Sequence, residues 1–198
     1  MKRTAIHIID KNRIELHEAD VTDVGPNDLL VRTTRSVIST GTESTAYTRK
    51  YGPGTHWDQW LHYPMTTGYL NCGVVEAVGS AVTKFKRGDR VASGGAHASL
   101  VVVGETRAAR VPDAVPDEEA AWTHLGLITQ LGARAAEQLL GESVAIVGAG
   151  LLGQLVIQYA FVQGAKDVIV IDTSAARLAH AARHGATLTL QMDAKTAK

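Results

Sequence analysis

Residues 144–153 read Val144-Ala145-Ile146-Val147-Gly148-Ala149-Gly150-Leu151-Leu152-Gly153, an apolar strand that runs into the pattern G-x-G-x-x-G and then into an apolar helix. The first glycine of this pattern allows a tight turn, the second lets the backbone approach a pyrophosphate, and the third lets the helix pack closely on the strand. The helix start presents unpaired N–H groups to the phosphates. We therefore expect these residues, from Gly148 to Gly153, to hold a dinucleotide. A simple strand-to-helix turn in another α/β protein is the alternative.

A second apolar strand, Val168-Ile169-Val170-Ile171, ends in Asp172, nineteen residues beyond Gly153. A carboxylate at this place accepts hydrogen bonds from the adenosine ribose hydroxyls and repels a 2′-phosphate. We therefore expect Asp172, with Thr173 beside it, to bind the cofactor and to favour NAD over NADP. The alternative for Asp172 is a solvated helix N-cap ahead of Ser174. Arg177 is expected to be a surface residue.

The part of the chain after Val115 alternates helix and strand. Pro116 and Asp117 open an alanine-rich helical segment, with Asp117 as its N-cap, that runs to Leu140 and ends at Gly141. The pattern then predicts strands at 143–147, 167–171 and 187–191, and helices at 151–163 and 174–184. This alternation is typical of βαβ units and a parallel sheet.

The part before Val115 consists of short apolar runs separated by turn signals, which indicates β structure. Gly25-Pro26-Asn27-Asp28 and Lys86-Arg87-Gly88-Asp89 are the clearest turns. The predicted strands are residues 4–9, 13–17, 29–38, 73–78, 90–92 and 100–103, which would form a small barrel or sandwich. Residues 45–67 are irregular and are expected to form a long loop with some helix. The sequence therefore predicts two domains, residues 1–115 and 116–198.

Composition limits the class of partner. The chain has 198 residues, 20 Lys and Arg against 20 Asp and Glu, and 45% hydrophobic residues, so it can bury a substantial core and carries no net charge. Binding to nucleic acid or an anionic membrane needs an excess of Lys and Arg. We therefore expect a small-molecule substrate, no nucleic acid and no membrane.

Cys72 is the single cysteine. One cysteine excludes an intrachain disulfide framework and a thiolate-rich zinc site, and it fits a reducing compartment. The segment Met1 to Asp10 has no apolar region of the kind that a signal peptide needs, and no stretch has the apolar length of a membrane helix. A cytoplasmic protein is expected.

Several blocks together resemble the medium-chain dehydrogenase/reductase superfamily, the alcohol dehydrogenase-like proteins. They are residues 26–32 (Pro-Asn-Asp-Leu-Leu-Val-Arg), 79–91 (from Gly79 to the Gly-Asp-Arg-Val block), 111–113 leading to 118–121, the glycine fingerprint, 177–178 and 185–186. The resemblance implies the α/β fold class: a GroES-like β-barrel domain followed by the first half of a Rossmann-type parallel sheet. It also implies an NAD-dependent oxidoreductase that transfers hydride between an alcohol and a carbonyl.

The resemblance also bears on metal binding. Zinc-dependent members carry a Cys after the third strand and a Gly-His-Glu triplet, whereas this chain has Ser39 and Gly68-Tyr69-Leu70 at those places. Serine, tyrosine and leucine do not make a zinc site, and the four-cysteine structural lobe is missing. We therefore expect a zinc-free branch with no metal. The hydroxyls of Ser39, Thr42 and Tyr69 then become the catalytic candidates, with packing as the alternative for each.

Other histidines and aromatic residues are weaker candidates. His56 and His62 flank Asp58, but their spacing matches no metal-ligand template, so we expect loop residues. His124 is expected to be a packed or interdomain residue. Three aromatic residues could line the floor of a substrate pocket or form a small hydrophobic cluster outside the main core: Trp57, Trp60 and Tyr63.

Two rival functions stay open. One is an enone or quinone reductase, which prefers NADPH; Asp172 counts against it. The other is a non-catalytic nucleotide-binding product, either a truncated remnant or a subunit. The predicted parallel sheet has three strands, whereas a complete Rossmann domain has six. We therefore expect weak or no catalysis unless another polypeptide, a second chain or a partner in a homo-oligomer, completes the sheet.

Overall fold

A computed structural model describes residues 1–21, 23–193 and 195 of the chain. The chain divides into two compact units, Met1–His124 (unit 1) and Leu125–Lys198 (unit 2). The division falls within helix α4 (Thr123–Ala135). Among the described residues, none of the helices is both long enough and apolar enough to span a membrane. Each unit is described below by itself.

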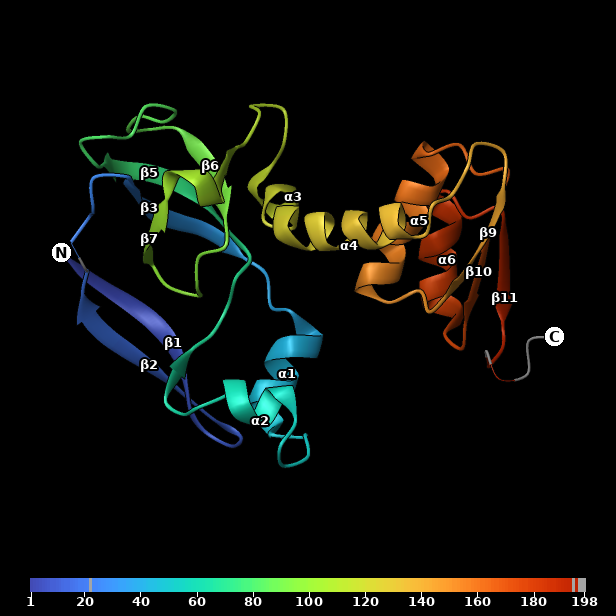
Figure 1. Cartoon of the computed structure of the whole chain (residues 1–198), viewed down its shortest axis with the longest axis horizontal. Coiled ribbons are helices and arrows are strands. Elements are labelled where there is room, and N and C mark those ends of the chain that lie inside the picture. The colour runs from blue at the N-terminus through green and yellow to red at the C-terminus, as the bar shows by residue number, and fades with distance from the viewer. Residues whose placement is uncertain (22, 194, 196–198) are drawn as a thin grey trace. The chain divides into compact units, whose positions relative to one another are not determined.

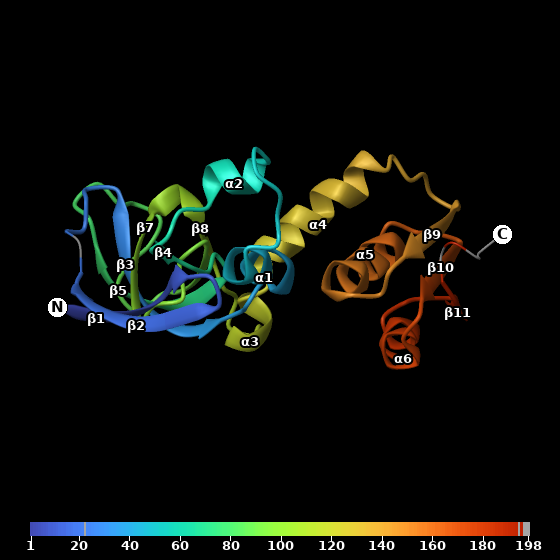
Figure 2. The same cartoon turned by 90° about the horizontal axis from the view of Figure 1, so that it is seen from below.

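Unit 1 is built from two antiparallel sheets (Figure 1 and Figure 2). The larger sheet has the strand order β7-β3-β5-β6-β8, and the smaller one has the order β2-β1-β4. The strands are β1 (Lys2–Asp10), β2 (Arg13–Asp20), β3 (Asp28–Ser36), β4 (Met65–Thr66), β5 (Asn71–Val78), β6 (Arg90–Ser93), β7 (Leu100–Gly104) and β8 (Ala108–Arg110). This curled antiparallel arrangement is the expected GroES-like β domain.

Apolar residues on alternate positions of these strands form the core of unit 1. Leu29 and Val31 on β3 pack with Val75 on β5 and Val91 on β6, and all four side chains are at most 1% exposed. The expected turn at residues 25–28 forms, with the Asp28 carboxylate accepting a hydrogen bond from the Gly25 amide at 3.1 Å. The short apolar runs and the turn signals therefore predicted these strands and this turn correctly.

The irregular stretch between β3 and β5 contains two helices, α1 (Thr40–Thr48) and α2 (His56–Trp60). A short 3₁₀ helix, η1 (Glu105–Arg107), and helix α3 (Asp117–Ala120) follow later in the chain. Ser39 is the N-cap residue of α1. The turn that precedes α1 and the segment that precedes β5 carry the polar residues described below.

Unit 2 has a three-stranded parallel sheet of order β11-β10-β9. Its elements after α4 are β9 (Ser143–Val147), α5 (Leu151–Val162), β10 (Asp167–Asp172), α6 (Ala175–Arg183) and β11 (Leu188–Gln191). Figure 1 shows α5 and α6 along one face of this sheet. Ile157 on α5, Ala181 on α6, and Val168 and Val170 on β10 are fully buried between the layers. The expected βαβαβ arrangement is confirmed.

The single helix predicted from Asp117 to Leu140 is wrong. The segment forms α3 and α4 with a break at Ala121 and Trp122, and α4 ends at Ala135. Glu137 then takes a left-handed φ of 53°, which closes the helical run well before Gly141. Alanine favours helix throughout such a segment, so composition hides the break. Asp117 is also the first helical residue rather than the N-cap, which is Pro116.

Candidate functional site

The glycine-rich loop of unit 2 joins β9 to α5. Gly148 has a φ of 95°, which favours glycine, and its amide donates a hydrogen bond to the Ile171 carbonyl at 2.8 Å. A Cβ added at Gly153 would lie 1.9 Å from the Gly148 carbonyl oxygen, so only glycine lets α5 approach the loop this closely. A Cβ at Gly150 would meet no atom within 4 Å. The backbone at Gly150, the N-cap of α5, is therefore open to a ligand.

Asp172 lies at the carboxyl end of β10 and is only 8% exposed. Its carboxylate accepts hydrogen bonds from the Ala149 amide at 2.8 Å and the Ser174 amide at 2.7 Å. The N–H groups of Ser174 and Ala149 hold the pKa of Asp172 below its usual range. Asp172 is thus an ionised residue that holds the glycine-rich loop, not a solvated N-cap. The N-cap of α6 is Ser174.

The remaining cofactor candidates surround this loop. Ala149 is buried, whereas Leu151 and Leu152 are 40% and 46% exposed at the first turn of α5. Thr173 is exposed after Asp172, and its carbonyl accepts a hydrogen bond from the Gln191 side chain at 3.2 Å. The first N–H groups of a helix lack intrahelical acceptors. An open glycine backbone, these N–H groups and a nearby carboxylate together fit the pyrophosphate and ribose of a dinucleotide.

The three catalytic candidates of unit 1 lie together. The Tyr69 hydroxyl donates a hydrogen bond to Ser39 Oγ at 2.5 Å and lies 3.4 Å from Thr42 Oγ1. Ser39 is buried, and Thr42 and Tyr69 are half-buried. The turn before α1 supplies Ser39, helix α1 supplies Thr42, and the segment before β5 supplies Tyr69. Residues thirty positions apart in the sequence thus form one hydroxyl cluster.

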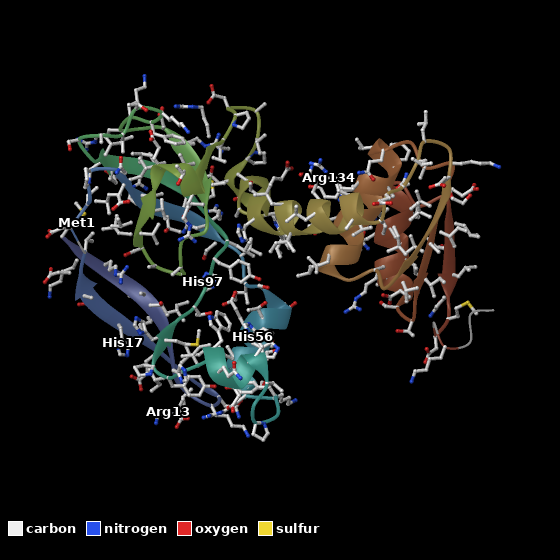
Figure 3. The ribbon with its side chains drawn as sticks, in the orientation of Figure 1. Met1, Arg13, His17, His56, His97 and Arg134 are labelled. Atoms are coloured by element: carbon white, nitrogen blue, oxygen red, sulfur yellow. The ribbon has the colours of Figure 1, made fainter. Side chains whose placement is uncertain are left out.

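The structure adds two residues that the sequence analysis missed. Glu43 lies on α1, and His97, which Figure 3 labels, lies on the loop between β6 and β7. His97 Nε2 lies 3.0 Å from Glu43 Oε2, and both residues are buried. His97 Nδ1 lies 2.9 Å from the Ser36 hydroxyl, which is exposed. In the sequence, the only indication of this pair is the carboxylate of Glu43, which directly follows Thr42.

Glu43 holds the hydroxyl cluster through its remaining lone pairs. Its Oε1 accepts a hydrogen bond from the Ser39 amide at 2.7 Å, and its Oε2 accepts one from the Thr67 hydroxyl at 2.6 Å. Burial works to raise the pKa of Glu43, but the hydrogen bonds from His97, Thr67 and Ser39 outweigh it, so the pKa lies below its ordinary value. Glu43 is therefore an ionised carboxylate, and carboxylates of this kind accept hydrogen bonds only.

Gly68 lets its segment approach His97, whose amide donates a hydrogen bond to the Thr67 carbonyl at 2.8 Å. Its φ is 97°, and an added Cβ would lie 2.6 Å from the His97 backbone nitrogen. Leu70, the last member of the Gly-Tyr-Leu triplet, is fully buried. His124 contacts Tyr69 from α4, with their ring centroids 5.6 Å apart in an edge-on arrangement.

The donor set in unit 1 does not match a zinc site. Within the described ranges, no group of three or more His, Cys, Asp and Glu side chains is placed to hold a metal ion. Glu43 and His97 are surrounded by hydroxyl groups, which are poor zinc ligands. On α2, His56 stacks against Trp60 with ring centroids 6.3 Å apart, and His62 contacts the Gln59 carbonyl.

A curled antiparallel sheet followed by a βαβαβ unit with a glycine-rich loop defines a class of α/β proteins with a dinucleotide-binding motif. A comparison with protein families matches residues 25–140 to the alcohol dehydrogenase GroES-like domain. This match covers more than half of the chain. The chain therefore belongs to the alcohol dehydrogenase GroES-like domain family, and its membership of the medium-chain dehydrogenase/reductase superfamily is confirmed.

Individual relatives agree with this family. L-threonine 3-dehydrogenase from Anaeromyxobacter sp. (strain Fw109-5) is 31% identical over 207 residues, covering 87% of this chain and 57% of the relative. The solved quinone oxidoreductase of Pseudomonas syringae pv. Tomato DC3000 is 28% identical, with a TM-score of 0.79, covering 96% of this chain and 58% of that one. The chain thus spans little more than half the length of these relatives.

A third comparison concerns the fold alone. The structure of an alcohol dehydrogenase from Escherichia coli CFT073, complexed with NADH, is 23% identical to this chain. Its TM-score is 0.82, and the match covers 96% of this chain and 62% of that one. Both units therefore have the fold of known dehydrogenases.

Proposed function

We propose that the chain is the substrate-binding and adenosine-binding part of an NAD-dependent oxidoreductase that interconverts an alcohol and a carbonyl compound. The observation that carries this proposal is the Asp172 carboxylate, which is ionised and hydrogen-bonded to the glycine-rich loop. A negative charge at this place suits the adenosine ribose and disfavours a 2′-phosphate. The dehydrogenase relatives support the oxidoreductase class.

In this proposal, unit 2 holds the cofactor. The first turn of α5 and the open backbone at Gly150 would bind the pyrophosphate, and Asp172 would accept hydrogen bonds from the ribose hydroxyls. Ala149, Leu151, Leu152 and Thr173 would line the same loop. The nicotinamide group, when bound, supplies a carbon that gives or takes hydride.

We further propose that unit 1 acts on the substrate without zinc. The hydroxyls of Ser39, Thr42 and Tyr69 would hold the reacting oxygen of the substrate and move its proton, a role that a metal ion fills in other enzymes. The hydrogen bond between Tyr69 and Ser39 at 2.5 Å supports this assignment because a chain of hydrogen-bonded hydroxyls can pass a proton. Glu43 and His97 would keep the hydroxyls in place.

We propose that further polypeptide covers unit 2, supplied by this protein, a second chain or another copy. Several large apolar side chains are exposed there: Val147 on β9 is 65% exposed, Leu188 on β11 is 48% exposed, and Phe161 and Val162 on α5 are 60% and 80% exposed. Exposed apolar surface of this extent favours association. The buried free Cys72 fits a reducing compartment, so we place the protein in the cytoplasm.

An NADPH-dependent enone or quinone reductase is the second candidate, because one relative is a quinone oxidoreductase. Calorimetric titration of the chain with NADH and NADPH separates the candidates. Tighter binding of NADH supports the proposal, whereas tighter binding of NADPH favours the reductase. If neither cofactor binds, the nucleotide-binding role is wrong for this chain.

A further inference from the structure

Unit 1 contains a cavity of about 150 Å³ beside the hydroxyl cluster. The side chains that matter for its chemistry are Thr42, Glu43, Trp60, Met65, Thr67 and Tyr69. Trp60 and Met65 supply apolar surface, and the other residues supply oxygen atoms. The volume suits a group of a few non-hydrogen atoms, since a water molecule takes about 30 Å³ in the liquid.

Glu43 fixes the direction of the Thr67 hydroxyl in the cavity wall. Thr67 is 7% exposed, and its hydroxyl lies 2.6 Å from Glu43 Oε2. Because an ionised carboxylate only accepts hydrogen bonds, the single hydrogen of Thr67 must point at Glu43. The lone pairs of Thr67 Oγ1 are then the part that a ligand can use.

The Tyr69 hydroxyl lines the same cavity and forms a hydrogen bond with Ser39 Oγ at 2.5 Å. The Ser39 amide is in turn bound to Glu43, so the position of Ser39 depends on the same carboxylate. The hydrogen bond from that amide does not orient the Ser39 hydroxyl, so the hydroxyls of Tyr69, Ser39 and Thr42 can each rotate to donate or to accept.

Glu43 is engaged by three protein donors. It accepts hydrogen bonds from Ser39, Thr67 and His97, against the roughly four lone pairs of a carboxylate. Its effect on a ligand is mainly indirect: it turns the Thr67 hydroxyl into an acceptor and adds negative charge behind it. A ligand that donates a hydrogen bond is favoured over one of the same shape that only accepts.

We propose that this cavity binds the alcohol form of the substrate in preference to the carbonyl form, because Glu43 fixes the Thr67 hydroxyl as a hydrogen-bond acceptor. The inference rests on the proposed function for the identity of the substrate. It states that the protein without bound cofactor binds the alcohol more tightly than the carbonyl compound. Glu43 acts here as a positioning residue. His97 Nε2 is a third donor to the Glu43 carboxylate.

The test uses 2-propanol and acetone, which share one branched shape and differ in the hydroxyl hydrogen. Binding of each to the whole chain is followed by the NMR shifts of residues around the cavity. We expect 2-propanol to bind about fivefold more tightly or better. Equal affinities, tighter acetone binding, or binding of neither compound would overturn the inference.

Two variants and one control make the test specific. In Glu43→Gln, an amide N–H₂ group can donate to Thr67 and free its hydrogen to point into the cavity. The ratio of the Kd of acetone to the Kd of 2-propanol should then fall towards one. Thr67→Val should weaken 2-propanol binding alone. Thr45→Val, which removes a hydroxyl that bonds to the Gly41 carbonyl outside the cavity, should leave the ratio unchanged.

The two proposals fail separately because this experiment contains no cofactor. Equal affinities for 2-propanol and acetone would overturn the alcohol preference and leave NADH binding standing. Absence of NADH binding would overturn the proposed function and leave the measured ratio intact. A dispersed NMR spectrum of each variant shows that it folds, so an unchanged ratio in folded Glu43→Gln would count against the role of Glu43.

Discussion

The carboxylate of Asp172 accepts a hydrogen bond from the Ala149 amide at 2.8 Å, which ties the end of β10 to the glycine-rich loop. The same carboxylate accepts a second bond from the Ser174 amide, at the N-cap of α6. Asp172 thus has a structural task in addition to its proposed contact with ribose. A change at Asp172 should affect both the loop and the cofactor preference.

The variant Asp172→Asn tests this double role. Its one carbonyl oxygen cannot serve both amides as an ionised carboxylate does, and the repulsion of a 2′-phosphate is lost. We expect NADH affinity to fall by roughly tenfold, with the gap between NADH and NADPH narrowing. Calorimetry measures both affinities. Asp167→Asn on the same strand, whose carboxylate accepts from the Ser143 hydroxyl, is the matched control and should bind NADH normally.

Gly153 gives a second prediction. An alanine Cβ there would lie 1.9 Å from the Gly148 carbonyl oxygen, which is backbone and cannot move away cheaply. We expect Gly153→Ala to lower the free energy of unfolding by about 2–3 kcal/mol or more and to abolish NADH binding. Gly132→Ala is the control: this glycine of α4 has nothing within 4 Å of an added Cβ. It should stabilise α4 by about 0.5–1 kcal/mol. Equal stability of the two variants in denaturant titrations would contradict the expected clash.

The elements of unit 2 could be predicted from the sequence because their signals are local. The strand at Ser143–Val147 matches its predicted range, and α5 (Leu151–Val162) differs by one residue. Apolar periodicity and the glycines report directly on backbone conformation at those positions. The predicted helix after Asp117 was wrong because alanine carries no signal for a helix break.

The buried pair Glu43 and His97 could not be predicted in this way. The two residues are 54 positions apart and belong to a helix and a loop, so no periodic pattern relates them. Their contact depends on how α1 and the β6–β7 loop pack in three dimensions. By contrast, the resemblance to a family brought Ser39, Thr42 and Tyr69 together as candidates, and the structure places these hydroxyls in contact. Their catalytic role stays a prediction.

Cys72 supplies a third prediction. Its side chain is fully buried on β5, and burial, together with the nearby negative charge of Asp117, raises the pKa of the thiol to about 11. The reactive thiolate is therefore scarce at neutral pH. We expect alkylation by iodoacetamide at pH 8 to be negligible in the folded chain and complete in denaturant, as measured by intact mass. Rapid alkylation without denaturant would show that Cys72 is accessible.

Tyr69→Phe tests the proposed catalytic hydroxyl in a preparation that turns over an identified substrate. Loss of the hydroxyl removes the group that shares a hydrogen bond with Ser39, so we expect kcat to fall by about 100-fold. Tyr159→Phe is the matched control, because the Tyr159 hydroxyl donates to the Gly126 carbonyl in unit 2. It should lose about 1 kcal/mol of stability and keep its kcat. An unchanged kcat in Tyr69→Phe would remove Tyr69 from the mechanism.

The lowered pKa of Glu43 predicts how stability depends on acid. Because the folded pKa lies below the ordinary value of 4.5, the unfolded chain takes up the proton first as the pH falls. The stabilisation that Glu43 contributes is therefore fully present above pH 4.5 and is lost as the pH falls through the folded pKa.

Glu43→Gln should remove this contribution to the pH dependence of stability. The difference in unfolding free energy between the native chain and the variant should shrink between pH 5 and 3, by at most about 1.4 kcal/mol per pH unit. Urea titrations at each pH measure it, and Thr45→Val, which removes no titratable group, should show a constant difference. A difference that grows on acidification would mean that Glu43 is protonated in the folded chain, and Thr67 would then no longer be fixed as an acceptor.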